Sequence, residues 1–434
     1  MPKKICVVGT GYVGLIAAVG LSDFGNNVVG VDLDKKKIDM LVQGISPIYE
    51  PGVEDYLNRN LESGRLTFTT EIAKALQESN VIFIAVGTPE KENEEADLSY
   101  VEAVVDTIAE NLNEYKVIVT KSTVPVGTNR WIKELLKKKT GGNNFDVVSN
   151  PEFLREGKAA QDFFHPDRTV IGYESEKAKD IMFRVYRTLN VTSVPFVWCS
   201  LETAELIKYA SNAFLATKIT FINEIANLSE AVGADIHQVA KSMGMDGRIS
   251  SKFLHPGPGY GGSCFPKDTK AIVSFGKKFG VKMKLIDSVI KTNELQKERM
   301  VEKIKKLSGT LKGKTITVLG LAFKQQTDDV RESPAITIID KLLKEGVNVQ
   351  AHDPKAMDNF SKLFPDIMYC HTAYDAAKNA DALLIVTEWN EYRGLELSKL
   401  KTIMKGDILL DTRNLLDPDD VKEAGFIYEG VGRK

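Results

Sequence analysis

The chain of 434 residues is long enough for two to four domains of about 100 to 200 residues each, which excludes a single small domain. Apolar residues make up 43% and charged residues 27%, and 57 Lys and Arg against 59 Asp and Glu leave a net charge of -2. This balance excludes a disordered chain and argues against nucleic acid as a partner. The four cysteines have neither CxxC nor Cys/His metal spacing, so we expect no disulfide scaffold, no structural zinc and a cytoplasmic location.

The N-terminal segment superficially has the pattern of a signal peptide, because Lys3 and Lys4 precede an uncharged run over residues 5–22. Four glycines interrupt this run, which is too rich in glycine for a membrane helix and is better explained as a strand, a turn and a helix. We therefore expect no transmembrane segment and no membrane partner.

Short β-branched runs alternate with longer amphipathic stretches in the first half of the chain, a pattern that predicts strands and helices in alternation. The predicted strands are residues 5–8, 28–31, 81–86 and 117–120. This rhythm is typical of a parallel sheet. The continuously apolar run 81–86 indicates a strand buried on both faces, as in a sheet covered by helices.

The pattern changes at residue 201, from where apolar residues at helical spacing and few helix breakers predict one long helix over residues 201–233. Such a helix would connect two lobes and offer a surface for oligomerisation. A second alternation of strands and helices follows it. The strands predicted there are residues 315–319, 347–351, 382–386 and 408–410.

Together these patterns predict an α/β fold, in which two Rossmann-like parallel-sheet domains are joined by a long central helix. The expected boundaries are 1–200, 201–300 and 301–434. Because no low-complexity or Pro/Gly/Ser-rich linker separates these parts, we expect them to pack together rather than to be tethered.

A glycine fingerprint follows the first predicted strand and opens a helix, with Gly9, Gly11 and Gly14 in the spacing G-x-G-x-x-G. The first glycine permits a tight turn, the second lets the backbone approach a pyrophosphate, and the third allows close packing of helix on strand. Asp32, at the end of the next strand, should accept hydrogen bonds from the adenosine ribose and would repel a 2′-phosphate, which favours NAD over NADP. A glycine turn that binds no ligand is the alternative, and the combination of strand, fingerprint, helix and acid argues against it.

Hydroxyl side chains follow two of the predicted strands, in Gly87-Thr88-Pro89 and in Ser122-Thr123-Val124-Pro125. Doubly wound sheets bind ligands at the carboxyl ends of their strands, so these hydroxyls can reach a cofactor or a substrate. Turns and helix caps are the alternative interpretation.

Residues 256–268 form a glycine-rich loop that carries Cys264, with Lys267 and Asp268 three and four residues further on. The glycines free the backbone to wrap an anionic ligand, the lysine could stabilise a thiolate, and the carboxylate could handle protons or water. A cysteine is more often a small core residue. The charged neighbours and the loop favour a nucleophile instead.

Lys208 and Asn212 are four residues apart on the predicted long helix and therefore share a face. A solvent-exposed lysine is the ordinary alternative, although the apolar neighbours of Lys208 are compatible with a face turned toward an active site. The five histidines show no ligand spacing, so we assign neither a metal site nor a His-based triad.

Several ordered segments resemble the UDP-glucose/GDP-mannose dehydrogenase family and, within it, the UDP-glucose 6-dehydrogenases. Besides the fingerprint they are residues 121–125 (KSTVP), 150–157 (NPEFLREG), 261–268 (GGSCFPKD), and 322–324 (AFK) followed by 330–333 (VRES). The likeness runs nearly end to end and is far more specific than a lone glycine fingerprint.

This resemblance implies oxidation of the C6 alcohol of UDP-glucose to the carboxylate of UDP-glucuronate, with two hydrides passed to two successive NAD molecules. Cys264 would capture the intermediate aldehyde as a thiohemiacetal, which gives up the second hydride and leaves a thioester for water to hydrolyse. Lys208 would stabilise oxyanions or move protons, and Glu152 would act near the hydrolytic step. The residues implied to organise the catalytic water are Asp268, Asn212 and Thr123.

The resemblance also assigns residues 1–200 to NAD, 201–300 to dimerisation and the catalytic loop, and 301–434 to the UDP-sugar. The implied NAD contacts are Gly9, Gly11, Tyr12, Val13, Gly14, Asp32, Lys37, Thr88, Thr123, Glu156, Lys267 and Arg331. The implied substrate contacts are Glu152, Phe153, Leu154, Arg155, Lys208, Asn212, Arg248, Phe253, His255, Gly257, Tyr260, Gly261, Lys324 and, as a weaker candidate, Arg413. Arg248 would reach the substrate of a neighbouring subunit, so a homodimer is expected.

Other functions stay open as alternatives. GDP-mannose and UDP-N-acetylmannosamine dehydrogenases share the cysteine machinery, although residues 261–268 and 165–172 (HPDRTVIG) look more like the UDP-glucose branch. A one-step β-hydroxyacid dehydrogenase would need no thiol, and a non-catalytic NAD or sugar-nucleotide sensor would bind without reducing NAD. After its first strand the second lobe has only Gly320-Leu321-Ala322-Phe323, which weakens the case for a second NAD site.

Overall fold

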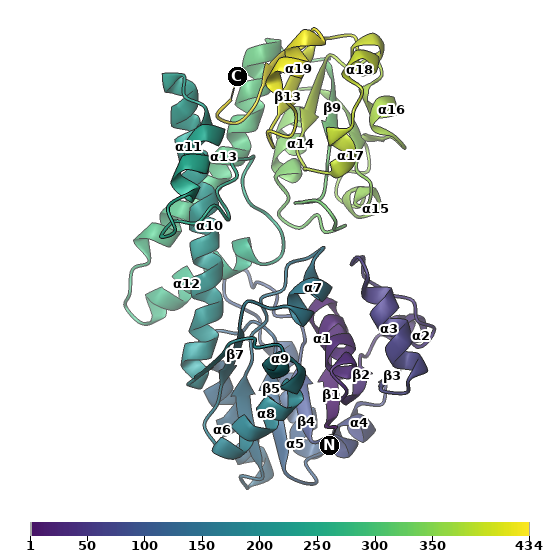
Figure 1. Cartoon of the computed structure of the whole chain (residues 1–434), viewed down its shortest axis with the longest axis vertical. Coiled ribbons are helices and arrows are strands. Elements are labelled where there is room, and N and C mark those ends of the chain that lie inside the picture. Colours follow the sequence, from purple (N-terminus) through teal and green to yellow (C-terminus); the bar gives the residue numbers. More distant parts are fainter. Residues whose placement is uncertain (1, 434) are drawn as a thin grey trace. The chain divides into compact units, whose positions relative to one another are not determined.

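The computed structural model of the chain describes residues 2–433, and its internal contacts define two compact units, Met1–Ser211 and Asn212–Lys434. Each unit contains one sheet (Figure 1). The predicted fold class, two Rossmann-like sheets and a long helix, is confirmed. The division into three parts at residues 200 and 300 stays a prediction.

The first unit holds an eight-stranded sheet with the order β3-β2-β1-β4-β5-β6-β7-β8. Its strands are β1 Lys4–Val8, β2 Asn27–Val31, β3 Leu66–Thr69, β4 Val81–Ile84, β5 Lys116–Thr120, β6 Phe145–Ser149, β7 Thr169–Gly172 and β8 Phe196–Cys199. Neighbouring strands run parallel except β6 and β7, which pair antiparallel at Ser149 and Gly172. The four strands predicted in this half are all present, although β4 ends two residues earlier than expected.

Helices cover both faces of this sheet, as its continuously apolar strands require. One face packs against α1 Tyr12–Asp23, α2 Lys35–Val42, α3 Val53–Glu62, α7 Ala159–Phe164, α8 Glu176–Val185 and α9 Arg187–Val191. The other packs against α4 Ile72–Glu78, α5 Ser99–Glu110 and α6 Thr128–Thr140. In β1, Ile5 and Val7 point to the first face, whereas Cys6 and Val8 point to the second, as the alternation of a strand dictates.

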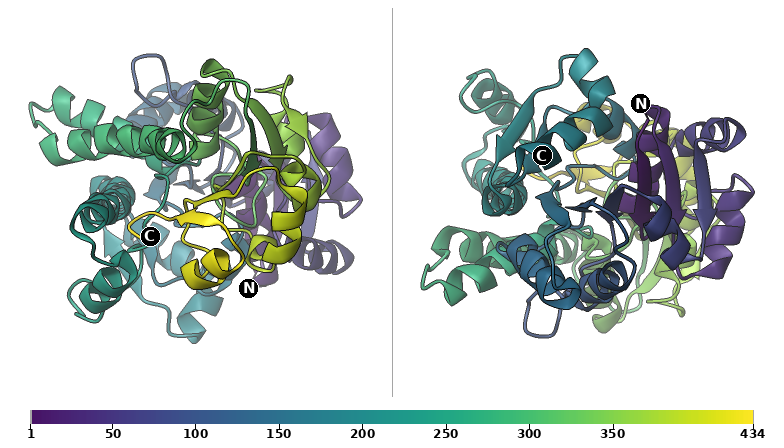
Figure 2. Two further views of the ribbon diagram at one scale, coloured as in Figure 1. Left: turned by 90° about the horizontal axis from the view of Figure 1, so that it is seen from above. Right: turned by 90° about the horizontal axis from the view of Figure 1, so that it is seen from below.

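The second unit holds a six-stranded parallel sheet whose order, β11-β10-β9-β12-β13-β14, repeats that of the first six strands of the first unit. Its strands are β9 Thr315–Leu319, β10 Asn348–His352, β11 Met368–Tyr369, β12 Ala382–Ile385, β13 Ile408–Asp411 and β14 Ile427–Glu429. One face is covered by α13 Lys284–Ser308 and α14 Pro334–Lys344, and by the shorter α15 Met357–Phe360. The other is covered by α16 Ala373–Ala377, α17 Asn390–Arg393, α18 Leu397–Ile403 and α19 Pro418–Glu423 (Figure 2).

The predicted long helix is α10, Leu201–Val232, whose 32 residues give a length of roughly 48 Å. Its first turns belong to the first unit and the rest to the second, which also contains α11 Ile236–Gly244 and α12 Phe265–Lys278. None of the helices within residues 2–433 has the combined length and apolar character needed to cross a membrane.

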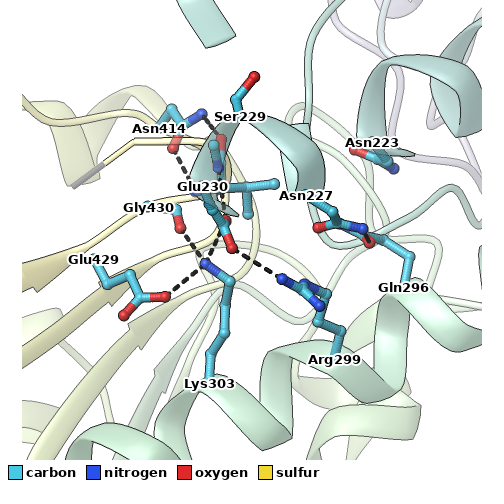
Figure 3. Close-up of polar contacts among 12 residues, drawn as sticks. Asn223, Asn227, Ser229, Glu230, Gln296, Arg299, Lys303, Asn414, Glu429 and Gly430 are labelled. Atoms are coloured by element: carbon cyan, nitrogen blue, oxygen red, sulfur yellow. Dashed lines mark hydrogen bonds and ion pairs between the residues drawn. The ribbon is translucent and has the colours of Figure 1, made fainter. Parts of the chain in front are cut away.

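Residues 429–432 are bound to α10 and α13 by a buried cluster of charges (Figure 3). Lys303 Nζ lies 2.6 Å from a carboxylate oxygen of Glu230 and 2.8 Å from one of Glu429, and it donates to the Gly430 carbonyl. Glu230 also accepts a hydrogen bond from the Gly432 amide. The last strand of the second sheet is therefore tied to two helices that precede the sheet in the sequence.

Candidate functional site

The glycine fingerprint has the geometry that a bound pyrophosphate requires. Gly9 has a φ of +94°, and a Cβ at Gly14 would lie 1.8 Å from the Gly9 carbonyl oxygen, so side chains are excluded at both positions. Among the described residues, a Cβ at Gly11 would meet no atom within 4 Å, so this position faces open space. Gly11 is the N-cap of α1, whose first turn is uncharged, and the amides there can receive the phosphates of NAD.

Asp32 lies beside this turn, where the adenosine ribose of NAD would be bound. One of its carboxylate oxygens accepts hydrogen bonds of 2.9 Å from both the amide and the hydroxyl of Thr10, and Lys37 Nζ is 3.7 Å away. Burial alone would raise the pKa of Asp32, but the hydrogen bonds from Asp34 and Thr10 and the charge of Lys37 hold it below its ordinary value. The next residue, Leu33, is 85% exposed and offers an apolar surface that the sequence patterns did not single out.

A buried carboxylate joins the fingerprint helix to the segment that carries Glu152 and Glu156. Glu50 accepts hydrogen bonds from the amides of Gly157 and Ala159, at 2.6 and 2.7 Å, and from the hydroxyl of Tyr12. Burial raises the pKa of Glu50 despite these donors. Glu50 was not predicted from the sequence, in which its only signal was its place in the segment Pro47-Ile48-Tyr49-Glu50-Pro51.

The two hydroxyl-bearing loops after β4 and β5 are joined to each other, because Thr88 Oγ1 donates to the Thr123 carbonyl at 2.8 Å. The loop after β5 is also anchored to α10. Glu205 accepts hydrogen bonds from the amides of Gly127 and Asn129, at 2.6 and 2.7 Å, at the start of α6. Glu205 is 2% exposed and was not predicted from the sequence.

Lys208 and Glu152 form a buried ion pair in the first unit. Lys208 Nζ lies 2.8 Å from Glu152 Oε1, and the two residues are 3% and 5% exposed. This excludes the alternative of a solvent-exposed lysine at position 208. The Phe153 ring packs beside the pair, with its centroid 5.4 Å from Lys208 Nζ, and the second oxygen of Glu152 accepts a hydrogen bond from the Leu154 amide.

In the second unit, Cys264 is the N-cap of α12 and so stands at the positive end of that helix's dipole. One turn further on, Asp268 is 1% exposed and receives two side-chain donors. Asn212 Nδ2 lies 2.6 Å from one of its oxygens and Lys267 Nζ 2.7 Å from the other. The structure thus brings together Asp268, Asn212 and Lys267. Asp268 and Asn212 were expected to act together, whereas Lys267 was expected to contact the cofactor.

The glycine-rich loop before Cys264 is held by side chains of α10 and α13. The Gly257 amide donates to Asn223 at 2.8 Å, and the backbone of Tyr260 exchanges hydrogen bonds of 2.8 and 3.1 Å with the Asn293 amide group. A Cβ at Gly261 would lie 2.2 Å from a backbone oxygen. These contacts give the loop one defined conformation rather than the freedom that its composition suggests.

All four arginines expected at the substrate or the cofactor are paired with a nearby carboxylate. The pairs are Arg155 with Asp162 at 2.5 Å, Arg248 with Asp246 at 2.6 Å, Arg331 with Asp329 at 2.7 Å and Arg413 with Glu388 at 3.1 Å. Lys324 Nζ lies 5.5 Å from the centroid of the Phe323 ring. A ligand phosphate would therefore meet cations whose charge is already partly balanced.

The start of the second sheet repeats the turn of the fingerprint but uses it differently. Gly320 has a φ of +98°, close to that of Gly9. The amides of Leu321 and Ala322, however, both donate to the buried Asp353, at 2.7 and 3.0 Å, and Trp389 Nε1 donates to the same oxygen. These two amides are not available to a pyrophosphate, which argues against a second NAD site in this unit.

Two doubly wound sheets, one with a complete dinucleotide fingerprint, and a cysteine at a helix N-terminus define a nucleotide-binding α/β protein of the dehydrogenase class. Three domains of the UDP-glucose/GDP-mannose dehydrogenase family match the chain in succession. They are the NAD binding domain over residues 3–190, the central domain over residues 202–295 and the UDP binding domain over residues 317–418.

Full-length relatives agree with these matches. The chain is 48% identical to UDP-glucose 6-dehydrogenases of Bacillus subtilis (strain 168) and Rhizobium meliloti (strain 1021), over 99% of this chain and 93% and 99% of the relatives. A solved UDP-glucose dehydrogenase from Pyrobaculum islandicum matches with a TM-score of 0.94 and 38% identity, covering 100% of this chain and 98% of the other. The chain belongs to the UDP-glucose/GDP-mannose dehydrogenase family and is an NAD-dependent oxidoreductase.

Proposed function

We propose that the protein oxidises UDP-glucose at C6 to UDP-glucuronate and reduces two molecules of NAD for each sugar. The choice of substrate is supported by the end-to-end likeness to relatives named UDP-glucose 6-dehydrogenases. The choice of chemistry is supported by Cys264 at the N-terminus of α12 and by the buried cluster of Asp268, Asn212 and Lys267 one turn further on.

NAD supplies a hydride acceptor when it is bound at the fingerprint of Gly9, Gly11 and Gly14. In the first oxidation, C6 of the sugar loses a hydride and its hydroxyl loses a proton, which gives an aldehyde. The Cys264 thiolate then adds to the aldehyde carbon and forms a thiohemiacetal. A second hydride then leaves that carbon and a proton leaves its oxygen, which gives a thioester. Water hydrolyses the thioester, which releases the carboxylate and restores the thiol.

Lys208 is proposed to act on the oxygen at C6. As an ammonium it stabilises an oxyanion more than a neutral ground state, which is the condition for catalysis by charge. Its partner Glu152, 2.8 Å away, is the carboxylate to which a proton can be passed without leaving the buried pair. Asp268 and Asn212, with Thr123, are proposed to hold the hydrolytic water.

The test is to count the NADH formed when limiting UDP-glucose is mixed with excess NAD and the purified protein. Two NADH per sugar would support oxidation through to the carboxylate. One NADH per sugar would mean release at the aldehyde and would contradict the role of Cys264. Reduction of NAD with GDP-mannose or UDP-N-acetylmannosamine, but not with UDP-glucose, would contradict the proposed substrate.

Replacing Cys264 by Ala should abolish formation of the carboxylate, because no covalent intermediate can form. Cys370→Ala is a matched control, since Cys370 lies in the apolar core of the second unit. We expect that control to keep wild-type turnover. Full conversion to the acid by the Cys264→Ala protein would refute the thioester route.

We also propose a homodimer and a cytoplasmic location. Support for the dimer comes from α10, on which Phe214, Phe221 and Leu228 are 64%, 43% and 57% exposed at seven-residue intervals. Large apolar side chains at this spacing form a stripe along one side of a helix, as at helix–helix interfaces. The cytoplasmic location rests on the cysteine pattern of the sequence.

A further inference from the structure

One turn of the second unit holds a residue in a strained backbone conformation beside the loop that leads to Cys264. Residues 330–333 form a β-turn, which is closed by a hydrogen bond of 3.1 Å from the Ser333 amide to the Val330 carbonyl. The third residue of this turn, Glu332, has a φ of +53°, in the left-handed region where turns prefer glycine or asparagine. A glutamate in this conformation carries a backbone strain that its surroundings must offset.

The direction of one carbonyl depends on this conformation. The Gly262 amide, two residues before Cys264, donates a hydrogen bond of 2.9 Å to the Arg331 carbonyl. A negative φ at Glu332 would require the peptide plane between Arg331 and Glu332 to turn over, as between type II and type I turns. The Arg331 carbonyl would then point away from Gly262. The left-handed conformation at Glu332 is therefore a condition for this hydrogen bond.

The loop also lies tightly against the turn and the segment before it. A Cβ at Gly261 would lie 2.2 Å from the Glu332 carbonyl oxygen. A Cβ at Gly262, whose φ is +84°, would lie 2.7 Å from the Phe323 ring. A change in the conformation of the turn would therefore shift the loop that leads into Cys264.

A buried lysine stands beside the strained residue. Lys297, on α13, is 2% exposed, and its Nζ lies 3.9 Å from a carboxylate oxygen of Glu332 and 2.8 Å from one of Glu294. The stem of Lys297 passes beside the loop, since a Cβ at Gly259 would lie 3.3 Å from its Cγ. Attraction between Lys297 and Glu332 favours the conformation of the turn that the structure shows.

On the proposed function, in which Cys264 is the nucleophile, we propose that Glu332 is a positioning residue for Cys264. Its left-handed backbone, stabilised by Lys297, points the Arg331 carbonyl at the Gly262 amide and so fixes the course of the loop two residues before the thiol. Glu332 itself contacts neither the sugar nor NAD in this role.

The test uses two measurements, hydrogen exchange at the Gly262 amide and kcat for NADH formation at saturating UDP-glucose and NAD. A β-branched residue resists a positive φ, so in Glu332→Val exchange should become about tenfold faster and kcat should fall about tenfold. Glycine adopts this conformation without help, so Glu332→Gly should stay within about twofold of the wild type in both measurements. Lys297→Met keeps the length of the side chain but loses the charge, and should change both by about threefold in the same direction as valine.

Two controls separate this role from a general loss of stability. Asn379 is another exposed residue with a positive φ, +59°, in the turn before β12 of the same unit. Asn379→Val should lower the melting temperature but leave kcat and exchange at Gly262 unchanged. Glu294→Gln removes the nearer partner of Lys297 without touching the turn, and should also leave kcat unchanged.

Faster exchange and lower kcat in Glu332→Val, both recovered in Glu332→Gly, are the supporting result. Wild-type exchange at Gly262 in folded Glu332→Val, or faster exchange with a wild-type kcat, would overturn the role of Glu332. If Glu332→Val folds poorly, the double variant decides, because Lys297→Met should cause no further loss of kcat in the Glu332→Gly background. A further loss there would also overturn the inference.

A wild-type protein that forms no NADH from UDP-glucose would instead overturn the proposed function. Hydrogen exchange at Gly262 distinguishes this outcome from the others, because it reports the state of the turn without turnover.

Discussion

Gly11 and Gly14 belong to one fingerprint, yet an added methyl group would meet very different surroundings at the two positions. At Gly14 it would lie 1.8 Å from the Gly9 carbonyl oxygen, whereas among the described residues it would meet no atom within 4 Å at Gly11. The third glycine of the motif is therefore required by the fold, and the second is required only by the ligand.

This contrast predicts opposite results for two alanine variants. Gly14→Ala should lower the melting temperature by several degrees, because α1 must move away from the turn. Gly11→Ala should melt like the wild type but bind NAD at least tenfold more weakly, since the methyl group occupies the space that the pyrophosphate approaches. Thermal melts and calorimetric titration with NAD check both predictions. If both variants bound NAD as tightly as the wild type, this turn would not be the pyrophosphate site.

The sequence predicted the types and local spacing of the site residues, but not their partners. Lys208 and Asn212 share a face because they are one helical turn apart, which periodicity alone predicts. Their partners Glu152 and Asp268 each lie 56 residues away in sequence and meet them only through the tertiary fold. Glu50 and Glu205 were missed for the same reason, because a buried charge is recognised by its surroundings, which a single sequence does not contain.

At the scale of elements, the position of the last strand, β14, and of residues 430–433 after it (the tail) depends on Glu230. Burial alone would raise the pKa of Glu230, but Lys303, the Gly432 amide and Arg299 hold it below its ordinary value of 4.5. An acid whose pKa is lower in the folded state than in the unfolded chain stabilises the folded state at pH values above its pKa in the unfolded chain. This contribution should be complete above pH 4.5 and should disappear as the pH falls below it.

Glu230→Gln should cost about 3 kcal/mol at pH 7, because it leaves the buried Lys303 with one carboxylate fewer. The Gly432 amide donates to Glu230 and the Ile236 amide donates to the Gly432 carbonyl. Hydrogen exchange at both amides should become faster in this variant, and their protection should depend less on pH in the acid range than in the wild type. Glu298→Gln is the control, because the Glu298 pair with Lys341 is solvent-exposed and is expected to contribute at most about 1 kcal/mol. Equal protection of these amides in the two variants would argue against a role of Glu230 in holding residues 430–433.

Elements with uninterrupted apolar runs or helical periodicity were predicted, whereas six short strands were not. The sequence patterns indicated β1, β4 and α10, whose apolar runs or helical periodicity are uninterrupted. They did not indicate β3, β6, β7, β8, β11 or β14. Of these, β6 and β7 are largely buried, β8 is only partly buried and β11 has two residues. Their pairing is decided by neighbouring strands, so the local pattern carries little signal.

At the scale of the whole molecule, the exposed stripe of Phe214, Phe221 and Leu228 predicts self-association. Phe221→Glu places a charge in the middle of this stripe and should convert a dimer to a monomer in sedimentation equilibrium. If Arg248 completes the site of a partner, the monomer should also lose most of its turnover. Leu363→Glu, at a residue that is 52% exposed outside α10, should remain dimeric, and a dimeric Phe221→Glu protein would contradict the assignment of the interface.

The division of both sheets along the sequence also bears on the order in which the chain can fold. Every strand of the eight-stranded sheet is encoded before residue 200, and every strand of the six-stranded sheet after residue 314. During synthesis the first sheet can pair completely before the second has left the ribosome. Two of its contacts still require α10, because Glu152 pairs with Lys208 and the Gly127 amide donates to Glu205. The N-terminal unit is therefore complete only after the first turns of α10 have been synthesised.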